Sequence, residues 1–344
     1  MPEPKQNTVR PTIALRNAAA QALWDLGGGS LTEFRLAYSI NPLAWLAPED
    51  RNAPLRPSAH FLCLDRWGQP SPGEQAAGIP FHGEATRVLW RNDGSSPTEA
   101  TMSATLSEAG LEIRRKAVLA ASSAVLRVEE TVHNTRKTSK IYNMVQHPTI
   151  GPPFLTPETR VDCNATRGIS QHTPLPDPER VLMRWPDGIH QGRKSDLRHL
   201  ADDPMPAVTS FVVDEPIGWV TASTPQQGLL LGYFWKTEDH PWFNCWRHVD
   251  EAKKPMARGL EFGTTGLHQP FDVLTAKGSI LGRRLTAFLD AGASKTRHYT
   301  AFLAPIPDNW RGTTRVEVGG GRIAIRENGR RPRTIELTDH VRPA

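Results

Sequence analysis

Apolar and polar residues alternate along much of this chain with a period of two, which is typical of β-strands. Between residues 124 and 133, Leu126, Val128 and Val132 fall on one face, while Arg127 and Glu129 fall on the other. Similar segments recur and turn residues separate them, so the pattern predicts a large antiparallel β protein. The predicted strands comprise residues 111–119, 124–133, 141–145, 211–213, 219–222, 229–235 and 285–289.

Helical periodicity is scarce, and the clearest predicted helix is the short segment 18–26, which ends at three consecutive glycines. Residues 156–206 are rich in Pro, Asp, Arg and His, which predicts a long excursion from the sheets of the kind that often carries function. Near the end of the chain, residues 315–318 and 322–325 flank three glycines, and an Asn-Gly hairpin signal follows. The tail is therefore predicted to be ordered β structure.

The domain organisation follows from the absence of a low-complexity linker and of a long-period repeat in the sequence. All-β sandwiches commonly reach about 250 residues as one unit, so a length of 344 residues favours one large domain over two. We expect a β-sandwich domain over residues 1–305 and a C-terminal β extension over residues 306–344, packed on the same domain.

Composition and charge narrow the function classes. With 38% hydrophobic and 22% charged residues, the chain has enough apolar side chains to build a core, which excludes disorder and coiled coils. No run of about 18 apolar residues and no signal peptide is visible, so we expect no membrane partner. Three widely spaced cysteines fit reduced thiols and a cytoplasmic location. Residues 310–344 contribute +4 of the net charge of +5, so the charge gives no reason to expect a nucleic-acid partner.

Several catalytic motifs are absent from the sequence. There is no G-x-S-x-G elbow, no P-loop and no dinucleotide-binding glycine motif, which weighs against serine hydrolases and nucleotide-dependent enzymes. His240, Cys245 and His248 lie close together in sequence, but no fourth ligand lies nearby. We interpret them as a polar strand edge and expect no metal and no cofactor.

Three short segments carry candidate chemistry. Residues 78–85 bring His82 and Glu84 together in a turn bracketed by glycine and proline. His147 precedes a proline, which favours extended backbone, so we expect this histidine at the end of a strand, facing a cleft. Glu261 lies between apolar residues with glycines nearby. A carboxylate in such a segment is either part of a structural ion pair or held for proton transfer.

A fourth feature is the aromatic-rich segment 233–246, which holds six aromatic residues within fourteen positions. Aromatic faces with polar tips suit sugar rings, whose C–H faces are apolar and whose rims carry hydroxyl groups. Packing in the sheet core is the alternative interpretation for about half of them.

Taken in order, these segments resemble the aldose 1-epimerase (galactose mutarotase-like) family over roughly residues 10–305. The glycine-rich turn at 27–34 resembles the start of the family, and Phe81-His82-Gly83-Glu84 resembles its His-Gly substrate-binding turn. His147 follows two paired strands, at the position of the catalytic histidine, and Gly259-Leu260-Glu261 is similar to the segment with the catalytic glutamate. Residues 291–299 resemble the closing strand.

The sequence departs from the family pattern at two places, and the family's substrate-binding aspartate has no single counterpart. The usual Asn-His-Thr-Tyr is Gln146-His147-Pro148-Thr149 here, and Glu84 stands where a second glycine follows the His-Gly pair. The candidates for the family's substrate-binding aspartate are Asp162, Asp187 and Asp196.

The resemblance implies an all-β galactose mutarotase-like supersandwich and an isomerase that interconverts the α and β anomers of a free aldose by general acid–base ring opening. We expect Glu261 as the base and His147 as the acid, on opposite sides of one sugar, with His82 binding that sugar. The other expected substrate-binding residues are Glu84, Arg87, Trp235, Trp242, Trp246 and Arg247. The expected partner is a monosaccharide or small carbohydrate, bound by a monomer or homodimer.

Two alternatives remain open at the level of sequence. The protein could be a non-catalytic carbohydrate-binding protein, or a glycoside lyase or hydrolase on the same fold. The sequence also leaves open whether the sugar is anionic and is held by an arginine such as Arg87, Arg247 or Arg258.

Overall fold

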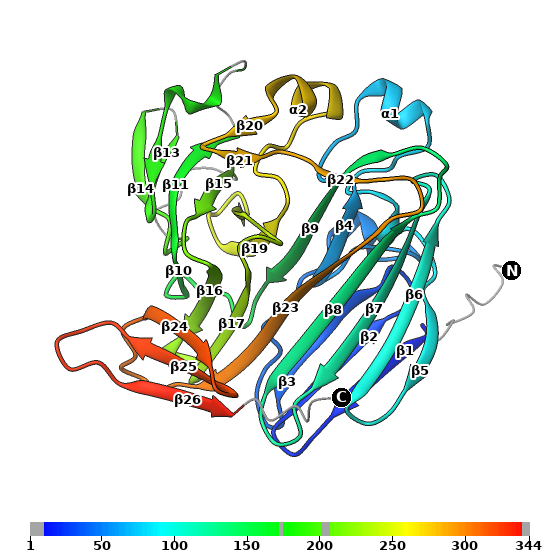
Figure 1. Ribbon diagram of the computed structural model, residues 1–344. Helices are drawn as coiled ribbons and strands as arrows, with labels where there is room; N and C mark the ends of the chain where they lie inside the picture. Colours follow the sequence, from blue (N-terminus) through cyan, green and yellow to red (C-terminus); the bar gives the residue numbers. More distant parts are fainter. Residues whose placement is uncertain (1–9, 172–174, 176, 191, 201–206, 339–344) are drawn as a thin grey trace, which may run out of the picture.

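Two large antiparallel sheets form the body of the protein (Figure 1). The computed structural model describes residues 10–171, 175, 177–190, 192–200 and 207–338. In the first sheet the strands run in the order β1 (Thr12–Arg16), β2 (Ala20–Asp25), β3 (Ser30–Leu36), β4 (His60–Asp65), β9 (Lys140–Ile150), β19 (Pro255–Gly263), β18 (Trp242–Val249), β15 (Ala207–Val213), β11 (Ala165–Ser170) and β12 (Met183–Arg184), and β22 (Ala287–Leu289) pairs with β9.

The second sheet lies across the core from the first. Its strands run in the order β10 (Arg160–Cys163), β16 (Ile217–Thr224), β17 (Leu229–Lys236), β23 (Ser294–Pro305), β8 (Val125–Asn134), β7 (Leu111–Leu119), β6 (Glu99–Leu106) and β5 (Arg91–Ser95).

Smaller elements surround this sandwich. They are a three-stranded sheet of β24 (Thr313–Gly319), β25 (Arg322–Glu327) and β26 (Thr334–Thr338), the pairs β13 (Asp187–His190) with β14 (Arg193–Asp196) and β20 (Ser279–Ile280) with β21 (Arg283–Arg284), the helices α1 (Pro72–Ala76) and α2 (Phe271–Lys277), and the 3₁₀ turns η1 (Pro48–Asp50), η2 (Glu84–Thr86), η3 (Pro178–Arg180) and η4 (Pro225–Gln227). Neither helix of the described residues is long and apolar enough to cross a membrane.

The all-β antiparallel architecture predicted from the alternating pattern is confirmed. The predicted helix at 18–26 is wrong, because Ala20, Ala22 and Trp24 are buried on one face of β2, which is hydrogen-bonded on both sides to β1 and β3. Alanine is common in helices, and this composition led to the helix prediction. The burial of every second residue is instead the pattern of a strand. The segment 156–206 is also less irregular than expected, because it contributes β10 and β11 to the two sheets; its residues 172–174, 176, 191 and 201–206 lie outside the described residues.

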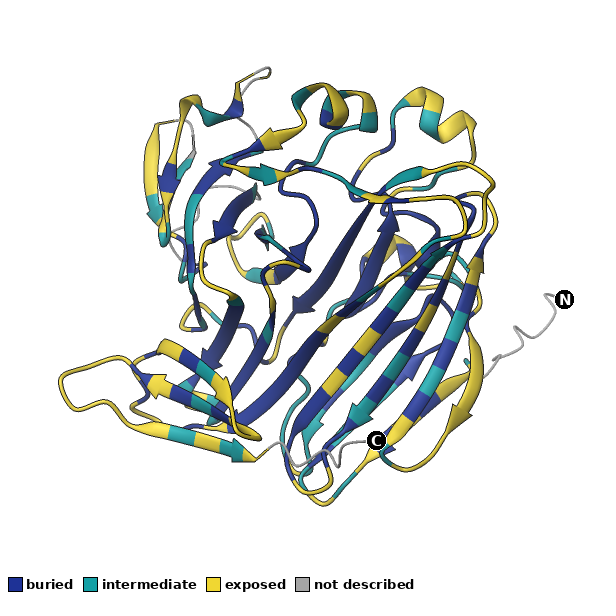
Figure 2. Cartoon of the chain, viewed as in Figure 1, coloured by how far each residue is buried: buried dark blue, intermediate teal, exposed yellow. Residues whose placement is uncertain are grey.

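Burial differs between the outer and the central strands (Figure 2). Strands β7 and β8 alternate between buried and exposed residues, because one face meets the core and the other meets solvent. Strands β9 and β19 are buried along most of their length. Their second face is covered by loops that follow β3 and β4, and this covered face holds the candidate site described below.

A chain of polar side chains crosses the core between the sheets. Arg115 of β7 donates from Nε to Oε1 of Glu130 on β8 (2.6 Å), and Gln146 of β9 donates to the other carboxylate oxygen (2.5 Å). Gln146 Oε1 lies 3.2 Å from Nε2 of His60, whose Nδ1 lies 3.3 Å from the hydroxyl of Tyr233. All five side chains are buried, and each lies on a different strand, so this network ties five strands of the two sheets together.

The three-stranded sheet near the C-terminus packs on the outer face of the second sheet. Ile323 and Ile325 of β25 are buried in one apolar cluster with Trp219 and Phe302. The predicted strands at 315–318 and 322–325 fall within β24 and β25. The domain boundary at residue 305 stays a prediction.

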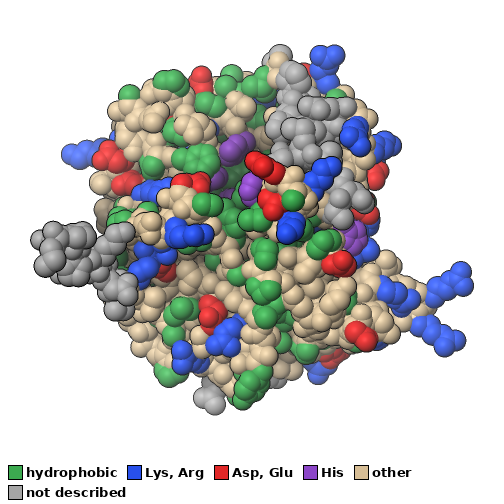
Figure 3. All heavy atoms as spheres, turned by 180° about the vertical axis from the view of Figure 1, so that it is seen from behind, with side chains coloured by type: hydrophobic (Ala, Val, Ile, Leu, Met, Phe, Trp, Pro, Cys, Tyr) green, Lys and Arg blue, Asp and Glu red, His purple; other side chains and the backbone are tan. Residues whose placement is uncertain are grey.

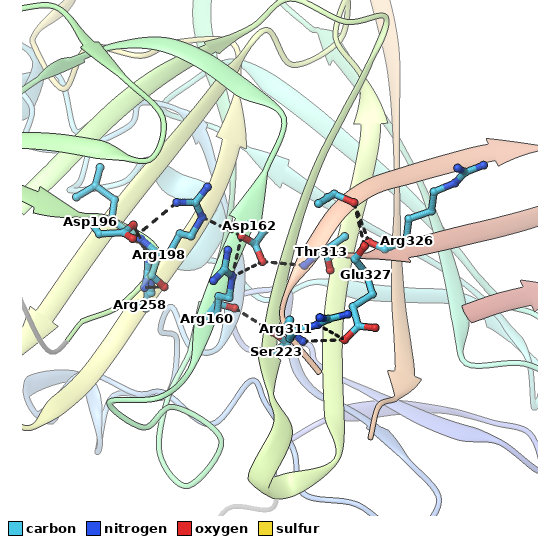
Figure 4. A network of polar contacts seen from close by, with 12 residues as sticks. Arg160, Asp162, Asp196, Arg198, Ser223, Arg258, Arg311, Thr313, Arg326 and Glu327 are labelled. Carbon is cyan, nitrogen blue, oxygen red and sulfur yellow. Dashed lines mark hydrogen bonds and ion pairs between the residues drawn. The ribbon is translucent and has the colours of Figure 1, made fainter. Parts of the chain in front are cut away.

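Polar contacts join the same sheet to β10 (Figure 4). Asp162 accepts hydrogen bonds from Nε of Arg160 (2.9 Å), Nε of Arg198 (3.1 Å) and the backbone N–H of Thr313 (2.9 Å). Several arginines of the tail pair with acids of the same sheet, among them Arg333 with Glu327 at 2.6 Å. The positive charge of the tail is thus partly compensated within it.

Candidate active site

Three neighbouring strands present the predicted catalytic residues on one face of the first sheet. The antiparallel register places Phe61 of β4 opposite His147 of β9, and Gln146 of β9 opposite Phe262 of β19, which puts Glu261 directly beside His147. Nε2 of His147 lies 3.3 Å from Oε1 of Glu261. The two side chains therefore lie side by side on the sheet, not on opposite sides of a sugar-wide gap as the sequence led us to expect. Strand β9 also continues past His147 to Ile150.

Local contacts fix the orientation of His147. Its ring stacks on Phe61 with the centroids 4.2 Å apart and the planes 17° from parallel. Nδ1 lies 2.9 Å from the hydroxyl oxygen of Thr149, which in turn donates to the backbone carbonyl of His147 (3.4 Å). With that hydroxyl proton engaged, Nδ1–H is the donor to Thr149, and Nε2 presents its lone pair to Glu261.

Burial shifts the protonation of both members of the pair toward the neutral forms. Loss of solvation raises the pKa of Glu261 to about 8, and a hydrogen bond from Nε1 of Trp67 to Oε2 (2.8 Å) partly opposes this rise. Burial lowers the pKa of His147 to about 3. Near neutral pH the proton of the pair therefore resides on Glu261, and the carboxyl group faces the imidazole lone pair.

His82 lies in a turn with a strained backbone, which brings its side chain to the same site. His82 has a positive φ of 63°, and Gly83 follows with a φ of 79°. A Cβ at Gly83 would lie 2.0 Å from the carbonyl oxygen of Leu64, so only glycine allows the turn to dock against β4. Nδ1 of His82 accepts from the backbone N–H of Gly68 (3.2 Å), which places the proton of the ring on Nε2. Strain of this kind in a non-glycine residue is common at functional sites.

These residues form part of the wall of a cavity of about 430 Å³, within the range of small-molecule sites. Aromatic side chains line the same cavity, among them Trp45, Trp67, Phe81 and Trp246. The charged side chains of Asp50 and Arg87 lie at its rim. Seen from behind, the molecule is hollowed at this face, with histidine side chains inside the hollow and charged side chains around it (Figure 3).

Of the residues predicted to bind substrate, His82, Arg87 and Trp246 line this cavity. Arg87 lies at the rim, where its guanidinium donates to Oδ1 of Asp50 at 2.9 Å. Trp246 is half-buried and its ring centroid lies 6.0 Å from that of His147. The structure thus brings these three together with His147 and Glu261, although their roles stay predictions.

The structure places the other four predicted residues away from this cavity. Trp235 belongs to the second sheet and stacks on Phe262 in the core at 4.2 Å, and Trp242 is covered by an apolar cluster that includes Leu274. Glu84 accepts from the backbone N–H of Ala109 (3.1 Å) and thereby anchors the His82 turn. Arg247 follows Trp246 on β18, so its side chain leaves the strand on the opposite face.

Several residues of the site escaped the sequence analysis, among them Trp67 and His268. Trp67 lies just after β4 and holds Glu261, while His268 packs edge-on against Trp67 with the centroids 4.6 Å apart. Neither residue belongs to a recognisable motif. The two lie far apart in the sequence, and only the folded chain brings His268 against Trp67. None of the candidate aspartates Asp162, Asp187 and Asp196 lines the cavity.

The two histidines of the segment 240–248 pack against aromatic rings. Among the described residues, no group of three or more His, Cys, Asp and Glu side chains is placed to hold a metal ion. His240 packs edge-on against Phe262 (5.4 Å), and His248 stacks on Trp246 (5.8 Å).

Solved structures share this fold over nearly the whole chain at low sequence identity. A protein from Synechocystis is 15% identical with a TM-score of 0.63, and the match covers 89% of this chain and all of that one (100%). A galactose mutarotase related enzyme from Lactobacillus acidophilus is 13% identical with a TM-score of 0.62, covering 87% and 99% of the two chains. A galactose mutarotase-like protein from Lactobacillus casei is 14% identical with a TM-score of 0.61, covering 86% and 100%.

The chain matches no protein-family model and no curated protein sequence. At these identities the likeness establishes the fold, which is the galactose mutarotase-like β-sandwich. The resemblance predicted from the sequence is confirmed at this level.

Proposed function

We propose that this protein is an isomerase of the aldose 1-epimerase type, which interconverts the α and β anomers of a free, neutral aldose through the open-chain form. The observation that carries the proposal is the buried pair of His147 and Glu261 in a cavity lined with aromatic rings. The likeness to a galactose mutarotase related enzyme supports it.

The geometry of the pair suits ring opening of a pyranose. The C1 hydroxyl and the ring oxygen are bonded to the same carbon, so an acid and a base that lie side by side reach both oxygens of one bound sugar. In the free protein Glu261 carries the proton and Nε2 of His147 is free to accept one. Glu261 then protonates the ring oxygen while His147 takes the proton of the C1 hydroxyl.

Ring closure reverses these transfers. After rotation about C1–C2, Glu261 removes the proton from the hydroxyl that re-forms the ring, and His147 protonates the former aldehyde oxygen. Each residue therefore serves once as acid and once as base, and the pair returns to its starting state. These roles are the reverse of the sequence-based expectation, in which Glu261 takes the C1 hydroxyl proton and His147 protonates the ring oxygen during ring opening.

Charge at the cavity favours a neutral sugar over an anionic one. Among the described residues that line the cavity, Arg87 is the single permanent cation, and it is paired with Asp50. Burial lowers the pKa of His147 to about 3 and that of His268 to about 4, so these imidazoles are uncharged near neutral pH. A phosphate or uronate would therefore meet no uncompensated positive charge.

The test is anomer exchange measured by NMR exchange spectroscopy or polarimetry on glucose and galactose, with glucose 6-phosphate as the anionic comparison. We expect the protein to accelerate exchange of at least one neutral aldose and to act more weakly on the phosphate. Binding without exchange would favour a carbohydrate-binding protein instead, and release of product from an oligosaccharide would favour a lyase or hydrolase.

The pH dependence of kcat/KM should report the two ionisations of the pair. Activity should fall as pH rises through about 8, because Glu261 then loses the proton it must donate. Activity should also fall as pH drops toward about 3, because His147 then becomes protonated and accepts no further proton. A plateau between these limits is the expected profile.

Replacing Trp67 with phenylalanine should move only the alkaline limit of that profile. The indole N–H lowers the pKa of Glu261, so its removal should shift the limit to higher pH and leave the acid limit in place. Trp310→Phe is the matched control, because Trp310 lies in the apolar cluster beside the C-terminal sheet. An alkaline limit that stays in place in Trp67→Phe would contradict the role of Glu261 as the group that ionises there.

A further inference from the structure

The wall of the cavity continues beyond the catalytic pair as a run of aromatic rings. Trp246 lies 6.0 Å from His147 between ring centroids, and Trp45 follows at 5.4 Å from Trp246 with its ring edge-on. His248 stacks on Trp246 with the centroids 5.8 Å apart. The steps between these centroids are comparable to the spacing of consecutive pyranose rings in a glycan, and both tryptophans are half-buried.

A glycine of β19 leaves room between Glu261 and Trp246. Gly259 of β19 is paired with Trp246 and lies two residues before Glu261, on the same face. A Cβ at this position would lie 2.8 Å from Oε1 of Glu261 and 3.1 Å from the Cβ of Trp246. A side chain here would therefore crowd both Glu261 and Trp246.

The wall itself is firmly held. Trp246 projects from the middle of β18, between the hydrogen-bonded strands β15 and β19. The carbonyl oxygen of Trp45 accepts a hydrogen bond from the backbone N–H of Ala59 (2.8 Å), which ties this loop to the start of β4. A preorganised aromatic surface binds a ligand with little loss of conformational entropy.

Polar groups at the rim complement this aromatic surface. The Asp50–Arg87 pair lines the same cavity and offers both acceptors and donors, the arrangement that sugar hydroxyl groups require. Because the two charges compensate each other, the rim suits a neutral ring. One aldose bound over His147 and Glu261 leaves Trp45 and this rim pair for a further ring.

We propose that Trp45 and Trp246 form a subsite for a second sugar ring, and that the substrate is the reducing end of a neutral oligosaccharide. The reducing ring lies over His147 and Glu261, and the next ring lies in the corner between the two indoles, which stand at 79° to each other, with its apolar C–H face on one of them. The orientation of the glycan in this inference rests on the proposed isomerase function. The subsite itself is tested by binding alone.

The experiment compares glucose with maltose, cellobiose and lactose, whose reducing ring is glucose, by isothermal titration calorimetry. We expect at least one disaccharide to bind about three- to tenfold more tightly than glucose, the size of effect that one aromatic contact commonly supplies. Trp45→Ala should remove this advantage and leave the affinity for glucose unchanged, whereas Trp45→Phe should retain part of it. Tyr38→Ala, which truncates a fully exposed aromatic residue outside this cavity, is the matched control and should change neither affinity.

The outcomes separate this proposal from the proposed function. Equal affinities for glucose and all three disaccharides, or no measurable binding of any disaccharide, would overturn the subsite even if glucose anomers are exchanged. A disaccharide advantage that Trp45→Ala removes would support the subsite even if the protein exchanges no anomers. An advantage that persists in Trp45→Ala would also overturn it.

Discussion

Replacing Glu261 with glutamine is expected to lower kcat/KM for anomer exchange by about 10²–10⁴-fold, the contribution of one positioned proton transfer. Glutamine keeps the size of the side chain and its contact with Trp67, but it neither donates the proton to the ring oxygen nor takes it back. The loss should be visible in NMR exchange spectra at the substrate concentration used for the wild type.

The matched control for this variant is Glu129→Gln on β8. Glu129 is exposed on the outer face of the second sheet, pairs with His298 at 3.1 Å and does not line the cavity. This variant should exchange anomers at the wild-type rate. Undiminished exchange in Glu261→Gln would remove Glu261 from the mechanism and, with it, the proposed chemistry.

The stability of Glu261→Gln provides an internal check that the variant is folded. Burial raises the pKa of Glu261 from 4.5 to about 8 in the folded protein, so the folded state binds this proton more tightly than the unfolded chain. The contribution of this group to stability is therefore lost as pH rises from about 4.5 to about 8. Because glutamine does not ionise, the variant should gain Tm relative to the wild type at pH 8 and gain less at pH 5.

Replacing Glu130 with alanine is expected to lower the free energy of unfolding by about 3–5 kcal/mol. Glu130 is buried and binds both Arg115 (2.6 Å) and Gln146 (2.5 Å). Its removal leaves the guanidinium of Arg115 in the core without a counter-ion, and it leaves the amide of Gln146 without an acceptor. Urea denaturation measures the loss as a shift of the transition midpoint.

Glu129→Ala, one residue earlier on the same strand, is the control for this prediction as well. Its side chain faces solvent, so the change in stability should stay within about 0.5 kcal/mol. The double variant Arg115→Met/Glu130→Leu should recover much of the loss, because it removes the unpaired charge together with its partner. A loss in Glu130→Ala no larger than that in Glu129→Ala would show that the contacts of Glu130 with Arg115 and Gln146 do not stabilise the fold.

The sequence by itself determined the class of fold and the catalytic candidates. The alternation in residues 124–133 is a local property of the chain, and one buried face of a strand is enough to produce it, so β8 was predicted within one residue. His147 and Glu261 were found because each stands in a short motif whose order along the chain resembles a known family.

The tertiary structure decided what the strand pairing and the loop packing bring together. It selected Trp246 over Trp235 and Trp242, because all three fit the same local pattern and only their neighbours determine which of them meets the cavity. It also placed Trp67 beside Glu261, although 194 positions separate the two residues in the sequence. The proton on Glu261 is a consequence of burial, which depends on every element that covers the site and on no single stretch of sequence.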